Sequence, residues 1–144
     1  MTPAATTTLA DADFEELSAA LRAHAKGGLC AEAAVELMVE HRSWLVRADF
    51  VRRFVEMVDG LSGTPMAFVD WTGAADALSS GELACSSSEG QILRIAASVA
   101  DGIPVDLGGA MCALDAQNTL CVARTLLHAS GHGSLDIRVE GERA

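Results

Sequence analysis

Apolar side chains recur at helical spacing in one segment after another of this chain, and capping residues, glycines or prolines separate the segments. The clearest segment runs from Asp49 to Asp59, where phenylalanines and valines share one face and Arg52, Arg53 and Glu56 occupy the opposite face. A helix with one apolar stripe must bury that stripe against a neighbouring element. The sequence therefore predicts an all-α fold, a compact bundle of five to six short helices.

Local capping signals mark where these helices begin and end. Ser86 and Glu89 have the spacing of a capping box, in which each side chain bonds to the backbone of the other residue. Aspartates stand at the expected starts of four further helices: Asp49, Asp70, Asp106 and Asp115. Gly27 and Gly28 predict the end of the first helix, which starts near Asp11.

A single helical domain is expected over residues 11–132, with a segment lacking helical periodicity on each side. Residues 1–10 are rich in threonine and alanine, which predicts a flexible N-terminal tail. Residues 133–144 are expected to form a C-terminal tail or a short strand, because Leu135–Val139 alternates in polarity. Met66–Val69 has a similar character, so a minor β pairing between these two segments is a further expectation.

A shift of 57 residues aligns two parts of the pattern, placing Glu32 on Glu89 and Asp49 on Asp106. Each part would be a helix, a turn and an Asp-capped second helix, so the bundle can consist of two helical-hairpin units that arose by duplication. The alternative is a chance match between hairpins built with the same capping chemistry. The match fades after Val55.

Ten Lys and Arg residues against twenty Asp and Glu residues give the 144-residue chain a formal charge of −10. That balance argues against a protein that coats a phosphate backbone. No apolar run approaches the roughly 20 residues of a membrane span, and the N-terminal segment lacks the basic and apolar regions of a secretion signal. We therefore expect a cytoplasmic protein with four reduced cysteines. Lys26 is the single lysine beside nine arginines, a bias typical of a high-GC bacterium.

Cysteines and histidines near the C-terminus are the candidates for catalysis or metal binding. Cys121 and His128 fall on the expected polar face of the last helix, and the expected buried face holds Leu120, Ala123, Leu126 and Leu127. Seven residues apart, the thiol and the imidazole lie about 10 Å apart along the helix axis, too far for a hydrogen bond. A zinc site is not expected either, because Cys112 and Cys121 are nine residues apart and do not form a close ligand pair. His128 and His132 have helical ligand spacing, but Gly131 is expected to break the helix between them. Cys112 is expected in the core.

Two charged surfaces are the candidate partner-binding sites. Four arginines crowd around Trp44: Arg42, Arg47, Arg52 and Arg53. An acidic stripe lies on one face of the second helix, residues 31–42, and consists of Glu32, Glu36 and Glu40. If these two surfaces met between subunits, a salt-sensitive dimer would follow. Trp44 itself is expected to be a core anchor more than an interface residue.

The helix faces are well specified, whereas no constellation of catalytic groups is. We therefore expect a non-enzymatic protein-interaction or accessory module that can self-associate, with no metal and no cofactor. Its partner is expected to be a protein or a second copy, and neither a membrane nor a nucleic acid. The alternatives are a helix–turn–helix-type DNA-associated regulator and a small enzyme that uses Cys121 or a Cys/His metal site.

Overall fold

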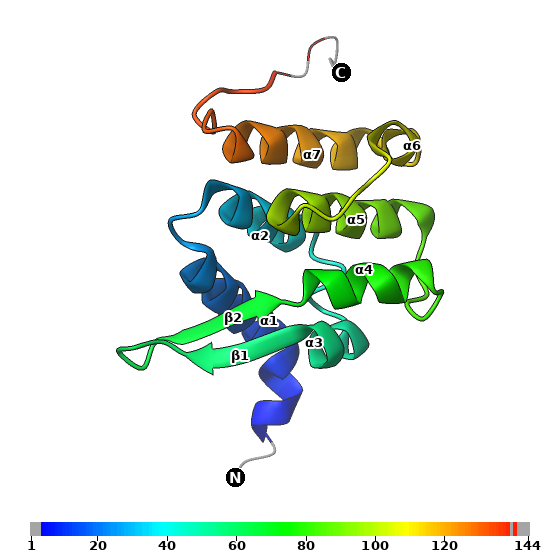
Figure 1. The fold of residues 1–144 in the computed structure, drawn as a ribbon. Helices are drawn as coiled ribbons and strands as arrows, with labels where there is room; N and C mark the ends of the chain where they lie inside the picture. Colours follow the sequence, from blue (N-terminus) through cyan, green and yellow to red (C-terminus); the bar gives the residue numbers. More distant parts are fainter. Residues whose placement is uncertain (1–3, 139, 141–144) are drawn as a thin grey trace.

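The structure, a computed structural model, describes the backbone of residues 4–138 and 140 and the side chains of residues 13–138 and 140. Within this range the chain forms seven helices and one two-stranded antiparallel sheet (Figure 1). The elements in chain order are α1 (Ala4–Ala25), α2 (Leu29–His41), α3 (Ala48–Phe54), β1 (Val55–Asp59), β2 (Pro65–Val69), α4 (Trp71–Ser79), α5 (Ser87–Asp101), α6 (Leu107–Cys112) and α7 (Ala116–Ala129). The predicted compact helical fold is confirmed in outline, with one more helix than expected and a small sheet.

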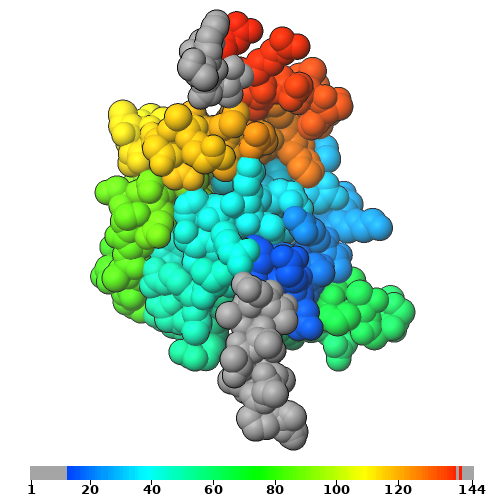
Figure 2. All heavy atoms as spheres, turned by 180° about the vertical axis from the view of Figure 1, so that it is seen from behind, coloured from blue at the N-terminus to red at the C-terminus, as the bar shows by residue number. Residues whose placement is uncertain are grey.

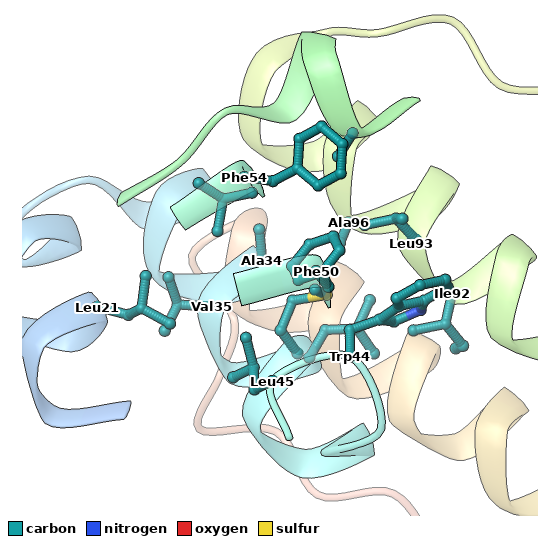
Figure 3. Packing of buried hydrophobic residues seen from close by; sticks show 14 of the residues in the cluster. Leu21, Ala34, Val35, Trp44, Leu45, Phe50, Phe54, Ile92, Leu93 and Ala96 are labelled. Atoms are coloured by element: carbon teal, nitrogen blue, oxygen red, sulfur yellow. The ribbon is translucent and has the colours of Figure 1, made fainter. Parts of the chain in front are cut away.

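Helix α5 is the centre of the core, because it contacts α2, α4, α6 and α7. Its apolar face interdigitates with Trp44, Phe50 and Phe54 from the segment around α3 (Figure 3). Trp44 is 1% exposed and donates its indole N–H to the backbone carbonyl of Glu89, 2.9 Å away. A buried indole nitrogen needs such an acceptor, so this bond fixes the turn before α3 against the start of α5.

Most of the predicted caps are present. The capping box of Ser86 and Glu89 starts α5. The side chains of Asp70, Asp106 and Asp115 each accept a hydrogen bond from a backbone N–H in the first turn of α4, α6 and α7. These bonds satisfy N–H groups that have no partner within the helix.

The segment from Asp49 to Asp59 is not one helix, which corrects the prediction. Helix α3 begins at Ala48 after Arg47, without a side-chain cap, and ends at Phe54, where the chain extends into β1. β1 pairs with β2, with Val55 opposite Val69. Valine favours the strand conformation. Hydrogen bonds to β2 stabilise the extended backbone of this segment more than burial of its helical apolar face would stabilise a helix.

The partner predicted for Met66–Val69 is therefore wrong, since this segment lies within β2 and pairs with β1. Residues 133–138 form no strand, and Val139 lies outside the described residues. At the other end, α1 begins at Ala4 and not near Asp11, so the helix includes residues expected in the N-terminal tail.

Helix α7 buries a different face from the predicted one. Cys121, Val122 and Thr125 are buried, whereas Leu126 is 46% exposed. Helix α7 packs mainly on α2 and more weakly on α5, so its buried stripe is narrow. The hydroxyl of Thr125 donates to the carbonyl of Cys121 at 2.9 Å, which satisfies this polar group in the core.

The proposed internal repeat pairs α2 with α5 and α3 with α6 at its 57-residue offset. Each of the two units, α2 with α3 and α5 with α6, consists of a longer helix, a connecting segment and a short helix. They diverge afterwards, because β1 follows α3 directly and α7 follows α6. A duplication origin stays a prediction.

Candidate functional site

An open groove of about 440 Å³ lies between α1, the turn before α3, α3 itself and β1. We call it the α1–β1 groove. Phe14, Leu17 and Leu45 are buried in its floor, whereas Val46 and Met57 are 51% and 59% exposed at its margin. An exposed apolar concavity of this kind is typical of a binding surface. Figure 2 shows the face on which α1 (blue) lies beside residues 40–55 (cyan to teal).

The margins of the groove carry opposite charges. Asp13 and Glu16 come from α1, and Arg47 and Arg52 come from the other side. Arg47 is already paired with Asp49 at 2.6 Å, whereas Arg52 is exposed and has no ion pair with a described residue. The groove therefore offers apolar contact area with an acidic edge and a basic edge.

The free edge of β1 borders the same groove. Asp70 donates its backbone N–H to Phe54, and Gly60 donates to Thr64, so every second residue of β1 bonds inward to β2. Met57 and Asp59 therefore point their backbone N–H and C=O groups away from β2. In the part of the chain that the structure describes, the sheet has no third strand.

The predicted arginine cluster is spread over several local contacts. Arg42 stacks on the ring of Phe14 at 3.9 Å, and Arg47 binds Asp49 and the carbonyl of Ala84. The hydrogen bond from Arg47 lowers the pKa of Asp49.

Arg53 pairs with Glu82 at 2.9 Å, which lowers the pKa of Glu82. The ion pairs of Arg47 and Arg53 thus neutralise half of the positive charge of the cluster, which reduces what it could offer to a phosphate backbone. Trp44 is buried, so its ring offers no contact area at the surface.

The acidic stripe of α2 is also used within the chain. Glu36 binds Arg22 of α1 at 2.7 Å, and Glu40 binds Arg124 of α7 at 2.6 Å. Glu32 accepts the backbone N–H of Gly27 and contacts His128 at 3.0 Å. These bonds, that to Gly27 first, lower the pKa of Glu32. The stripe therefore joins α2 to its neighbouring helices and has few acceptor positions left for a partner.

Cys121 is buried in the core and is not accessible at the surface of the protein. Its side chain is 3% exposed, and burial, with a further contribution from Glu40, raises the pKa of its thiol. A raised pKa keeps the thiol protonated and weakly nucleophilic. The imidazole of His128 contacts the carboxylate of Glu32 and not the thiol of Cys121, to which no hydrogen bond joins it among the described residues.

All four cysteines are free, and three of them are exposed: Cys30, Cys85 and Cys112. The exposure of Cys112 contradicts its predicted core position. Its helix, α6, has a single buried residue, Ala110, because it packs on one side only. Among the described residues, no group of three or more His, Cys, Asp or Glu side chains could hold a metal ion.

His41 is a half-buried titratable group at the end of α2. Its Nδ1 atom is buried without a hydrogen-bond partner among the described residues. Burial lowers the pKa of this imidazole, although Glu89 and Asp115 act in the opposite direction. Protonation of His41 is therefore opposed in the folded chain.

No family model, no curated protein and no solved structure matches this chain. Among the helices of the described residues, none is long and apolar enough to cross a membrane. A groove with an apolar floor, opposite charges at its margins and a free strand edge can hold a polypeptide segment.

Proposed function

We propose that this chain is a non-enzymatic protein-interaction module that binds a polypeptide partner in the α1–β1 groove. The observation that carries the proposal is the exposure of Val46 and Met57 at the margin of a groove with a buried apolar floor. Because each of these side chains is already about half buried, covering the rest of it in an interface is favourable by about 1 kcal/mol, roughly half of the value for a fully exposed side chain. The free edge of β1 adds backbone hydrogen bonds as a second source of affinity.

The α1–β1 groove is a different contact surface from the one predicted from the sequence. The sequence pointed to the arginine cluster and the acidic stripe, but many of these side chains bind partners within the chain. Exposed ion pairs contribute about 0–1 kcal/mol, so their rearrangement would add little to an interface. Of the candidate arginines, Arg52 and Arg47 lie at the groove itself.

Site-specific photocrosslinking tests this proposal. A benzophenone amino acid replaces Val46 in the groove or, as a control, Leu126, which has similar exposure on α7. The cells of origin are irradiated, and adducts are identified by mass spectrometry. We expect a discrete adduct from the Val46 position alone.

A second substitution links the adduct to the groove. M57D should abolish the Val46 adduct, because it places a carboxylate on the apolar margin, whereas L126D should retain it. Equal adducts from both crosslinker positions, or a Val46 adduct that M57D leaves unchanged, would contradict the proposal.

A further inference from the structure

We propose that the partner is a second copy of this chain, which pairs its β1 strand antiparallel to β1 across a two-fold axis at Met57. This inference rests on the proposed function and identifies the occupant of the same groove. Pairing would join the two hairpins into a four-stranded sheet.

The hydrogen-bonding pattern of β1 allows this pairing. Residues 54, 56, 58 and 60 are committed to β2, as the bonds at both ends of the hairpin show. Met57 can therefore exchange N–H and C=O bonds with Met57 of the second copy. The N–H of Asp59 can reach the carbonyl of Val55 in each direction, since the N–H of Val55 already bonds to Val51.

The side chains of β1 suit a copy of the same strand. With Met57 facing Met57, Glu56 lies opposite Val58 and Asp59 lies opposite Val55. No carboxylate faces another carboxylate, whereas a register centred on Asp59 would oppose two aspartates and is disfavoured. The chosen register also covers Met57 and Val58, which are exposed in the single chain.

The groove is consistent with the same symmetry. Met57 lies on the face of the sheet that carries Ala67 and Val69, both buried. Helix α1 packs on β2 and continues past the outer edge of β1 (Figure 1), so a strand added to β1 would lie over the groove. A two-fold interface must be complementary to itself, and margins of opposite charge fulfil this requirement.

The net charge of −10 on each copy gives this dimer a distinctive salt dependence. Two acidic copies repel each other at long range, and salt screens this repulsion. The contact itself is mainly apolar and made of backbone bonds, and exposed charge pairs at the groove margins contribute little. We therefore expect added salt to tighten the dimer several-fold. A dimer formed by the arginine cluster and the acidic stripe would weaken instead.

Sedimentation velocity over a concentration series, at low and high salt, tests the pairing with M57D and M57K. Each variant places two like charges at the two-fold axis, so each alone should be monomeric. Their mixture should form a heterodimer, because the lysine of M57K then faces the aspartate of M57D. L126D changes the charge equally on α7 and should remain dimeric, and circular dichroism checks that every variant folds.

The outcomes separate this inference from the proposed function. A wild-type chain that is monomeric at every concentration and salt, a dimer that M57D leaves intact, or a mixture that stays monomeric would each overturn the β1 pairing. If a monomeric chain still gives a Val46-specific adduct with another protein, the proposed function holds and the self-pairing alone is wrong.

Discussion

At the scale of single residues, burial decides the role of two side chains that look functional in the sequence. Trp44 stacks on Phe50 with ring centroids 5.3 Å apart and bonds to the carbonyl of Glu89. Cys121 lies beside Glu40 and Gln117 on the buried side of α7. Both are held in the packed interior, where a large aromatic ring stabilises the core and a thiol stays protonated.

Cys121 should be protected from thiol reagents. In variants that retain one cysteine each, we expect the Cys121 thiol to react at least about tenfold more slowly than those of Cys30 and Cys112, because reaction requires local opening of α7. Absorbance at pH 8 with a chromogenic disulfide measures the rates, and urea-unfolded protein serves as the control. A Cys121 thiol that reacts fastest in the folded chain would instead favour the small-enzyme alternative.

At the scale of elements, helix caps depend on residues close in the sequence, whereas strand pairing depends on other elements of the fold. The capping box of α5 involves two residues three positions apart, Ser86 and Glu89. The backbone N–H of Ser86, which bonds to the carboxylate of Glu89, is the main cause of the lowered pKa of this group. The hairpin, in contrast, depends on β2 and on the helix α1 beneath it.

Substitution S86A should lower the free energy of unfolding by about 1 kcal/mol, since it leaves the first turn of α5 without its side-chain acceptor. Urea denaturation followed by circular dichroism measures this change. S87A in the same turn leaves the capping box intact and should stay within about 0.5 kcal/mol of the wild type. If S86A and S87A have the same effect, the capping box does not stabilise the fold in solution.

At the scale of the whole molecule, the fold holds α2 between α1, α5 and α7. Ion pairs of the acidic stripe join α2 to α1 and α7 at the surface. Most of the buried residues of α2 belong to the apolar cluster that also contains Trp44. His41 lies half-buried at the end of α2. Burial lowers the pKa of its imidazole, so the folded chain disfavours the protonated form.

Acidification from pH 7.5 to 5.5 should therefore lower the free energy of unfolding. The folded chain holds His41 neutral, with a pKa below the ordinary 6.5, while the unfolded chain takes up a proton as the pH falls through 6.5. The free energy of unfolding falls with decreasing pH wherever the unfolded state binds more protons than the folded state.

Urea denaturation at a series of pH values measures this slope, which H41Q should flatten. The control H132Q, at an exposed position, should keep the wild-type slope. A slope that H41Q leaves unchanged would show that His41 is not the responsible group. Carboxylates with a lowered pKa, such as Glu89, add their own loss of stability at lower pH, as the pH falls through their folded pKa.

The sequence by itself determined the features that depend on neighbours a few residues away. Asp70, Ser86, Asp106 and Asp115 cap helices as predicted, because each side chain accepts a hydrogen bond from the backbone N–H three positions ahead. The net charge and the helical segments follow from composition and periodicity in the same way.

Only the tertiary structure decided which surfaces are buried and which are free. Val55–Asp59 became a strand through its pairing with β2, and α7 turned Cys121 inward because α2 lies on that side. The groove combines side chains from α1, α3 and β1 that are far apart in the sequence. The free energy of such contacts depends on all the elements that meet there, so periodicity within one segment does not specify them.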